Sequence, residues 1–413
     1  MAPKDMLARA QGLMDDLENY DRYSFPPTAA QKKRHIESLV QGIQATLDKA
    51  GADMEPENKG WYYTLLGSCL YHVERVELAV ACLLKAVKLL PSSVPAWHWL
   101  GKSYMMSGQW TSAEVALSRA KQAALSGNRS MNPTLLRQCL CTLSYLFRTR
   151  PSSTVNLTRA VGYARSAVEC EMDSPEAWEN LGVSLLKRAL LHPSSAMPGD
   201  IIGARVALRN AIERTGERNC PDAWCNLGAL EELLLEFQSA YDAYKTAFEQ
   251  DPTLERARVG ARSIRDTLFE ANRIAQRAYE HLQGRRRSAM PHPSGLIEQY
   301  TSGPSGEEKT VTLRVVQVVA GPPTVPTVCV VSTPQRSVGI LCLVQSPPTL
   351  ASGVQIKVRG PTVSTLSFGA GAESIHLLVF GVKESPLSCM TVSGRRITGE
   401  LLGPGIMKDS LKV

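Results

Sequence analysis

The chain has 413 residues, of which 44% are hydrophobic and 21% are charged, the balance of an ordinary globular protein. Its length favours two or three domains over a single core. The first residues lack the apolar core of a signal peptide, and no run of about 18 apolar residues is present to cross a bilayer. We therefore expect an intracellular protein without a membrane partner. The net charge of +7 is mild, so it permits an acidic or RNA partner without requiring one.

The ten cysteines do not form a recognisable metal site. They stand singly or as Cys139-x-Cys141 and Cys220-x4-Cys225, with neither paired CxxC knuckles nor a nearby His-x3-His. We expect reduced, mostly buried thiols, no metal and no cofactor.

The first fifty residues are predicted to be helical. They include an amphipathic run from Thr28 to Ala50, and we expect these helices to begin or cap the structure that follows.

From about residue 60 a pattern of Trp or Tyr, Leu, Gly and then Ala recurs along the chain. Gly67 and Gly101 are 34 residues apart, which is the period of the tetratricopeptide repeat (TPR), a pair of antiparallel helices. The matches are Tyr63 to Pro91, Trp97 to Ala120 and Trp224 to Pro252, with two longer units at Leu140 to Ala167 and Trp178 to Ala211. This spacing predicts a helical solenoid, in which the tryptophans are core wedges rather than ligand platforms.

The end of the solenoid is predicted at Gln283, where a long capping helix from Leu254 ends. Residues 284–309 are basic and rich in Pro, Gly and Ser, which indicates a linker. From residue 310 to 413, β-branched residues alternate in five or six short runs, which predicts a small all-β domain. Periodicity leaves an OB-like barrel and a sandwich both open. Because Phe368 and Phe380 are the only aromatics there, nucleic-acid binding is weakly supported and an interaction or docking domain is favoured. The fold class is thus mainly α, with domains at 1–283 and 310–413.

The first helix of each TPR pair lines the concave face, so groove positions follow by counting from the small residue at the helix crossing. Asn180 and Asn226 fall at equivalent positions, where their amides either hold an extended peptide or tie each helix to its neighbour. Arg148 suits a ligand carboxylate, and Asp222 with Glu176 or Glu255 suits a ligand cation, unless these charges simply face water. The full count places in the groove Gln138, Tyr145, Arg148, Glu176, Glu179, Lys187, Asp222 and Glu232.

The repeats with long turns, the basic linker and the terminal β domain resemble the tetratricopeptide repeat protein five (Strap) family, which joins a TPR superhelix to a C-terminal OB fold. The family's groove Arg ends a Leu-Ser-x-x-x-Arg stretch, matched by Leu143 to Arg148. Its groove Asp and Glu are matched by Asp222 in Asn219-Cys-Pro-Asp222 and by Glu255 after Asp251-Pro.

This resemblance implies recognition of the Met-Arg-Glu amino terminus of nascent α- and β-tubulin at the ribosome, followed by decay of the tubulin messenger RNA through a downstream adaptor. Arg148 would then pair with the peptide Glu, and Asp222 and Glu255 with its Arg. The basic run Arg285, Arg286 and Arg287 would contact ribosomal RNA, although it equally fits a solvated linker or a nuclear-import patch.

The sequence leaves the location and the partner open. A cytoplasmic adaptor for nascent tubulin and a nuclear stress-response cofactor that binds an acetyltransferase coactivator both fit. A chaperone cofactor that clamps a C-terminal carboxylate fits less well, because the groove has more acid than base. No Walker loop, GxSxG or HExxH motif is present, so we expect the protein not to be an enzyme.

Overall fold

The computed structural model describes residues 3–49, 54–126, 132–150, 153–191, 199–216, 218–284, 289–301, 310–320, 326–343, 350–359, 361–382, 390–393 and 395–396. The chain divides into two compact units. The first consists of residues 1–224 together with 247–254, and the second of residues 225–246 together with 255–413.

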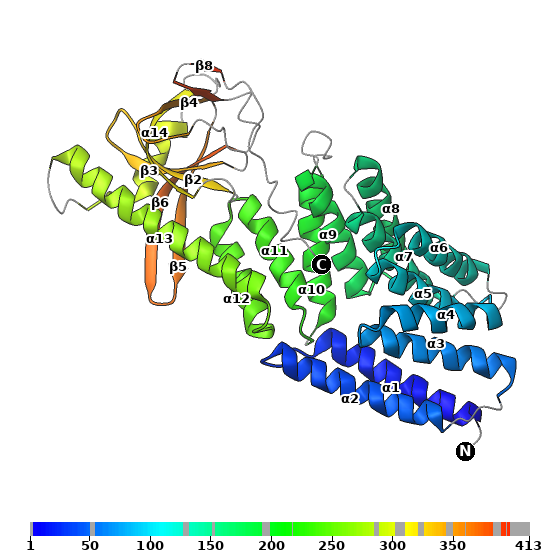
Figure 1. Cartoon of the computed structure of the whole chain (residues 1–413). Helices are drawn as coiled ribbons and strands as arrows, with labels where there is room; N and C mark the ends of the chain where they lie inside the picture. Colours follow the sequence, from blue (N-terminus) through cyan, green and yellow to red (C-terminus); the bar gives the residue numbers. More distant parts are fainter. Residues whose placement is uncertain are drawn as a thin grey trace. The chain divides into compact units, whose positions relative to one another are not determined.

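The first unit is a stack of helix pairs in chain order (Figure 1). The second helices α2, α4, α6 and α8 pack on their own partners and on the next pair, and the first helices α3, α5, α7 and α9 also pack on one another. This confirms the predicted helical solenoid. The helices are α1 (Pro3–Tyr23), α2 (Ala29–Asp48), α3 (Pro56–His72), α4 (Val76–Leu89), α5 (Val94–Met106), α6 (Trp110–Ser126), α7 (Pro133–Thr149), α8 (Thr154–Cys170), α9 (Pro175–Leu191) and α10 (Asp200–Thr215). A further pair, α11 (Pro221–Leu233) and α12 (Phe237–Gln250), has residues in both units.

Several helices of this unit begin at a polar cap. The side-chain oxygen of the residue before the helix accepts a hydrogen bond from the backbone N–H three residues later, and so satisfies a donor that the helix itself leaves unpaired. These capping residues are Thr28, Ser93, Asn132 and Ser153. The local sequence therefore determines where these helices start.

In three of the pairs the two helices approach closely at a glycine. A Cβ atom added at this position would lie only 2.5–2.7 Å from the Cγ atom of a leucine on the second helix. A larger residue would push the two helices apart, which explains why Gly recurs in the pattern. The contacts are Gly67 with Leu83, Gly101 with Leu117, and Gly182 with Leu208.

The repeat tryptophans stabilise the turns between successive pairs. The indole N–H of Trp97 donates to the carbonyl of Pro91 at 2.8 Å, and that of Trp178 donates to the carbonyl of Met172 at 2.6 Å. In both cases the acceptor lies six residues earlier, in the turn that precedes the helix. Both indoles therefore contact the turn before their own helix, although neither side chain is buried in the core, and the interpretation as core wedges stays a prediction.

The second unit combines α13 (Glu255–Gln283) with a sheet. A short 3₁₀ turn, η1 (Pro293–Gly295), and α14 (Ile297–Thr301) precede the strands. The sequence predicts five or six strands, whereas eight are present in the described part of the chain. They are β1 (Thr310–Ala320), β2 (Thr327–Ser332), β3 (Val338–Leu343), β4 (Gln355–Arg359), β5 (Thr362–Ala370), β6 (Glu373–Val382), β7 (Met390–Val392) and β8 (Arg395–Arg396).

The strand order is β5-β6-β3-β2-β1-β4-β7-β8. Neighbouring strands are antiparallel except β3 and β6, which run parallel with Ile340 opposite Val379. Only residues 360 and 361 separate β4 from β5, and these consecutive strands pair with β1 and with β6 respectively. Pairings therefore link β5, β6, β3, β2, β1 and β4 in one series, and the chain itself connects β4 to β5, the two ends of this series.

The two phenylalanines of the β strands lie in the core of this unit. Phe368 is 1% exposed and contacts Tyr241 of α12 and Phe269 of α13, with ring centroids 5.3 and 6.0 Å apart. Phe380 is fully buried and packs against Tyr300 of α14. Neither phenylalanine is therefore available as a platform for a nucleic-acid base.

α13 packs on β1, β2, β3 and β6. The limits of the two units consequently differ from the domain boundaries that the sequence predicts at residues 283 and 310. Those domain boundaries remain predictions. The helical period of α13 indicated a helix, but local sequence does not reveal which apolar surface will cover it.

Candidate functional site

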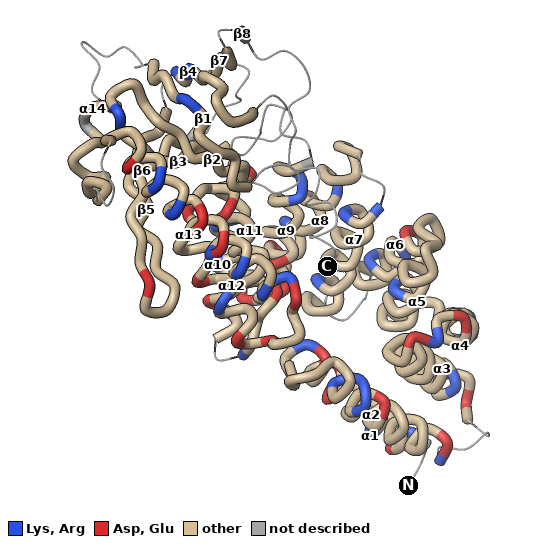
Figure 2. The backbone as a smooth tube through the Cα atoms, turned by 60° about the vertical axis from the view of Figure 1, so that its left-hand side comes forward, with Lys and Arg blue, Asp and Glu red and all other residues tan. Residues whose placement is uncertain are grey.

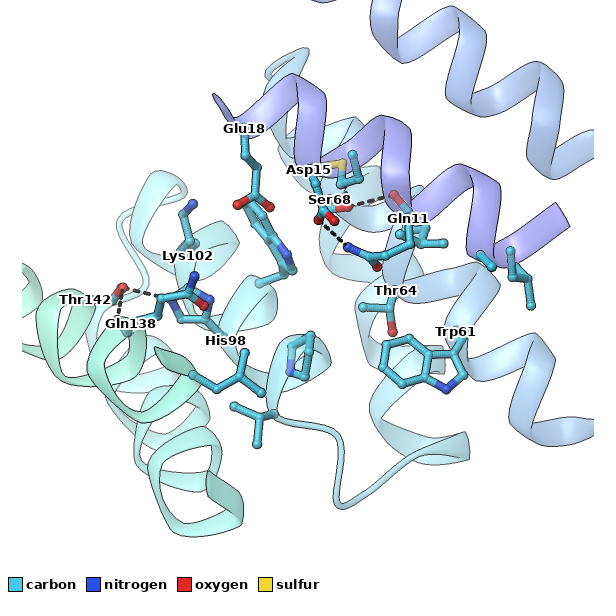
Figure 3. Close-up of a pocket in the computed structure, with 18 of the residues that line it drawn as sticks. Gln11, Asp15, Glu18, Trp61, Thr64, Ser68, His98, Lys102, Gln138 and Thr142 are labelled. Carbon is cyan, nitrogen blue, oxygen red and sulfur yellow. Dashed lines mark hydrogen bonds between the residues drawn. The ribbon is translucent and has the colours of Figure 1, made fainter. Parts of the chain in front are cut away.

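The first unit contains a cavity of about 710 Å³ between α1 and the first helices of the following pairs (Figure 3). α1 forms one wall with Leu7, Met14 and Glu18, among others, and α3, α5 and α7 form the opposite wall. This volume lies in the range typical of ligand sites, about 300–1,000 Å³. The cavity combines apolar surface with charges of both signs, and Figure 2 shows where the charged residues lie along these helices.

Lys102 of α5 is the central cation of this cavity. Its ammonium nitrogen lies 3.8 Å from the ring centroid of Trp99 and 4.8 Å from that of Tyr71, so two aromatic faces stabilise the charge. Burial lowers the pKa of Lys102 to about 8. The side chain forms no ion pair with a carboxylate among the described residues.

Among the acids around Lys102, Glu18 of α1 has the largest electrostatic effect on the pKa of the lysine. Figure 3 shows the two side chains in the cavity, with their charged ends near one another. Burial raises the pKa of Glu18, and the charge of Lys102 partly offsets this effect. The Glu18 carboxylate has no hydrogen bond or ion pair within the described part of the chain. Two opposite charges thus face the cavity without closing on each other.

A hydrogen-bonded chain next to Lys102 fixes the histidine of the cavity. Thr142 donates to the carbonyl of Gln138 at 2.9 Å, so its oxygen accepts from Nε2 of His98 at 2.8 Å. Burial lowers the pKa of His98 to about 3, which leaves the ring neutral at pH 7. The neutral ring carries its proton on Nε2, and Nδ1 remains an acceptor.

A second hollow of about 440 Å³ continues the groove. It shares Lys102, Cys141 and Thr142 with the larger cavity and also includes Tyr145 and Asn180. The predicted groove residue Arg148 lies beside this hollow, with its guanidinium 5.3 Å from the Tyr145 ring centroid.

Arg148 is 5% exposed and is held by neutral partners. Its Nη1 donates to the Asn180 carbonyl at 3.3 Å, to Asn180 Oδ1 at 3.2 Å and to Ser184 Oγ at 3.1 Å. Burial lowers the pKa of Arg148 to about 10, so it stays charged at pH 7. It pairs with no carboxylate among the described residues, and Nε and Nη2 have no hydrogen-bond partner there.

Glu179 supplies the negative charge near Arg148. Burial and the carboxylate of Asp222 raise the pKa of Glu179 to about 7, although Arg148 favours its ionised form. Glu179 has no hydrogen bond or ion pair in the described residues. The structure therefore brings Arg148, Glu179 and Asp222 into one electrostatic cluster.

Glu176, also a predicted ligand residue, already holds several internal partners. Its Oε1 accepts from Arg22 Nη1 at 2.7 Å and from the Tyr23 hydroxyl at 2.8 Å. Its Oε2 accepts from Ser174 Oγ at 2.7 Å and from Arg137 Nη1 at 3.4 Å. Glu176 therefore links the end of α1 to α9, and a ligand cation would have to displace Arg22.

The two predicted asparagines differ in their surroundings. Asn180 donates from Nδ2 to the Cys141 carbonyl on α7 at 2.9 Å, which is the alternative in which the amide ties its helix to a neighbour. Asn226 belongs to the second unit, is 1% exposed and has no described partner for Nδ2. The predicted ladder of peptide-holding amides stays a prediction.

The remaining predicted residues lie elsewhere. Glu255 belongs to the second unit, where it is exposed and paired with Arg258. The predicted ribosome contacts Arg285, Arg286 and Arg287 lie outside the described residues.

The sequence analysis missed the cavity residues of α5, although a signal was present. Tyr145 follows the small residue Ser144 of α7, and Lys102 follows Gly101 at the equivalent position of α5. The same count applied to the α5–α6 pair would have selected Lys102. The α1 wall had no comparable signal, because α1 carries no repeat pattern.

The described residues offer no other chemical centre. All nine cysteines among them are free thiols, and no group of His, Cys, Asp or Glu in this part of the chain is arranged to hold a metal ion. No described helix is both long and apolar enough to span a bilayer.

Stacked helix pairs with close crossings at Gly67, Gly101 and Gly182, a groove along the first helices and a small β domain define the class: the fold is that of a TPR solenoid with a β domain. It is similar to the human (Homo sapiens) protein "Tetratricopeptide repeat protein 5", with 22% identity over 328 residues, which cover 75% of this chain and 71% of the relative. This finding confirms the resemblance inferred from the sequence. No family model matches the chain.

Solved TPR structures are also similar to parts of the chain. The TPR protein YrrB, described as having an unusual peptide-binding site, is 21% identical, with a TM-score of 0.32, and the match covers 48% of this chain and 88% of YrrB. The assembly chaperone of RpL4 is 15% identical, with a TM-score of 0.43, and the match covers 66% of this chain and 99% of that one. Both TM-scores are too low to bear on function.

Proposed function

We propose that this protein is a non-enzymatic cytoplasmic adaptor whose groove recognises the Met-Arg-Glu amino terminus of nascent tubulin at the ribosome and promotes decay of the tubulin messenger RNA. The observation that carries the proposal is the pair of open charges in the groove. Arg148 has unused N–H groups, and Glu179 has an unpaired carboxylate among the described residues.

These charges match the second and third residues of the peptide. A glutamate side chain would reach Nε and Nη2 of Arg148 in a bidentate pair, the geometry that guanidinium and carboxylate groups favour. The arginine of the peptide would lie against Glu179 and Asp222 and relieve the repulsion between these two acids. A peptide with adjacent basic and acidic side chains would thus pair with both the acids and the arginine of the cluster.

The similarity to tetratricopeptide repeat protein 5 supports the choice of ligand. In this proposal Asp222 and Glu255 retain the roles that the family resemblance gives them, and Glu179 joins them. Binding of Arg285, Arg286 and Arg287 to ribosomal RNA and the recruitment of a downstream decay adaptor complete the proposed pathway.

We also propose an OB-like fold for the β domain. The series of pairings from β5 through β6, β3, β2 and β1 to β4 supports it, because β4 and β5, its two end strands, are consecutive in the chain. A sheet whose two end strands are held together by a short connection would leave fewer exposed edges, as in small barrels. Because Phe368 and Phe380 are buried, the domain would serve protein contacts better than base stacking.

The test is binding of a fluorescent ten-residue peptide that begins Met-Arg-Glu, with a scrambled amino terminus as the control ligand. We expect Arg148→Gln and Glu179→Gln each to weaken binding by roughly tenfold or more, because each removes a charge-assisted hydrogen bond. Arg165→Gln, which changes an exposed residue of α8, should bind like the wild type.

Equal binding of the native and scrambled peptides by the wild-type protein would refute recognition of tubulin. The nuclear cofactor would then be the better hypothesis, and the groove ligand would have to come from a nuclear coactivator.

A further inference from the structure

Lys102 is an unusual feature of the cavity between α1 and α5. Half-buried lysines normally pair with an acid, because an unpaired ammonium loses its hydration without compensation. Here the ammonium rests on the faces of Trp99 and Tyr71 and pairs with no described carboxylate. The side chain is positioned and charged, and its remaining N–H donors face the cavity.

The groups around Lys102 come from three helices. Glu18, Asp21 and Arg22 of α1 act on its charge, and Asp21 is already engaged with Lys32 at 3.4 Å. Arg22 is likewise engaged with Glu176. Of these charges only Glu18 remains unpaired among the described residues, and Figure 3 shows it across the cavity from Lys102.

His98 and Gln138 complete the surroundings of Lys102. Figure 3 shows both side chains close to Lys102 at the wall formed by α5 and α7. His98 has a free acceptor at Nδ1, and the amide of Gln138 supplies both a donor and an acceptor. A peptide backbone that passes along this wall would therefore find partners beside the two charges.

We propose that this cavity is a second peptide subsite of the groove, in which Lys102 binds an acidic side chain of the ligand and Glu18 binds a basic one. The inference rests on the proposed function in that the groove must hold an extended peptide. It adds that the protein reads charged residues beyond the first three. The occupant is a mixed-charge peptide segment, since the acidic α1 wall of Asp15 and Glu18 disfavours a phosphate group.

The spacing of the helices sets where the second acidic residue should fall. Lys102 and Tyr145, which contacts Arg148, line the same hollow on the neighbouring helices α5 and α7. Packed helices lie about 8–10 Å apart, and an extended peptide advances about 3.3 Å per residue, so the two subsites are roughly three residues apart. With the glutamate of the Met-Arg-Glu terminus at Arg148, an acid about three residues further along the peptide would reach Lys102.

The experiment uses the full chain and a set of fluorescent ten-residue peptides. Each begins Met-Arg-Glu and continues with a Gly/Ser tail, and four of them carry one Glu at position 5, 6, 7 or 8. We expect one acidic peptide to bind about tenfold more tightly than the neutral peptide. Lys102→Gln should abolish that gain and leave the neutral peptide unaffected.

The matched control is Lys85→Gln, because Lys85 also lies over an aromatic ring, that of Tyr63, but outside the cavity. It should preserve the gain. A second arm places Lys in the tail instead of Glu, and its binding should weaken in Glu18→Gln but not in Lys102→Gln. A direct readout is protection of Lys102 from acetic anhydride by the bound peptide, measured by mass spectrometry.

The two proposals fail in different ways. If the neutral peptide does not bind, recognition of Met-Arg-Glu is wrong, and the same acidic and basic tails are tested behind a Gly-Ser-Gly amino terminus. Binding that depends on Lys102 in that set would still support the subsite. The subsite is refuted if acidic and neutral tails bind alike, or if the gain survives Lys102→Gln.

Discussion

Glu176 offers the sharpest test of how α1 is attached to the repeats. Burial alone would raise its pKa, but Arg22, Ser174, Tyr23 and Arg137 together lower it from 4.5 to about 2. Each pKa unit corresponds to about 1.4 kcal/mol, so ionised Glu176 stabilises the folded state by about 3 kcal/mol at neutral pH. Its side chain is 25% exposed, so most of this value should survive screening by solvent.

The sign of the pH dependence follows from the lowered pKa. Stability due to Glu176 is fully present above the ordinary pKa of 4.5 and is lost as the pH falls toward 2. Glu176→Gln should therefore reduce the free energy of unfolding by about 3 kcal/mol at pH 7 and by only about 2 kcal/mol at pH 3.5.

Urea unfolding followed by tryptophan fluorescence measures this effect. All six tryptophans lie within residues 61–224, so their fluorescence reports the first unit. Glu169→Gln, at an exposed position of α8, should change the free energy by less than about 0.5 kcal/mol. A loss below about 1 kcal/mol at pH 7, or a loss independent of pH, would contradict the proposed attachment.

Three further predictions use the same protein. Gly101→Ala should destabilise the first unit by about 1–3 kcal/mol, because its Cβ would collide with Leu117. Gly12→Ala has open space around it and should stabilise the unit slightly. The midpoints of urea unfolding measure both effects. Arg188→Met should cost about 3–5 kcal/mol by stranding the buried Asp200 carboxylate, and adding Asp200→Leu should recover most of the loss in the same assay. Affinity for the Met-Arg-Glu peptide should rise from pH 6 to 7.5 as Glu179 ionises, and a flat titration would contradict the role of that carboxylate.

The repeat architecture was predictable because its causes are local. Each crossing glycine, such as Gly67 or Gly101, contacts a leucine of its own repeat. The capping side chains, too, bond to the first turn of the helix that they precede. The alternation of buried and exposed residues in the strands after residue 310 is also a local pattern, so it could be read from the sequence. Arg148, Glu179 and Asp222 could be selected together because equivalent repeat positions face one groove.

The α1 wall was not predictable, because its contacts depend on residues far away in the chain. Arg22 and Tyr23 meet Glu176 across 154 and 153 residues, and no spacing rule links them. The sequence analysis accordingly treated Glu176 as a ligand residue, while the contacts make it an internal acceptor. A long separation along the sequence likewise explains why Phe269 of α13 and Phe368 of β5 were not recognised as partners.

The placement of α1 also bears on how the groove selects a ligand. A TPR groove alone presents one wall, formed by the first helices. Here α1 supplies a second wall and brings Glu18 opposite Lys102, so a peptide in this cavity would meet charges from both sides. Because Glu176 anchors the end of α1, loss of this anchor should loosen the second wall and weaken Lys102-dependent binding more than binding at Arg148. Stability and specificity of the groove would then depend on the same half-buried carboxylate.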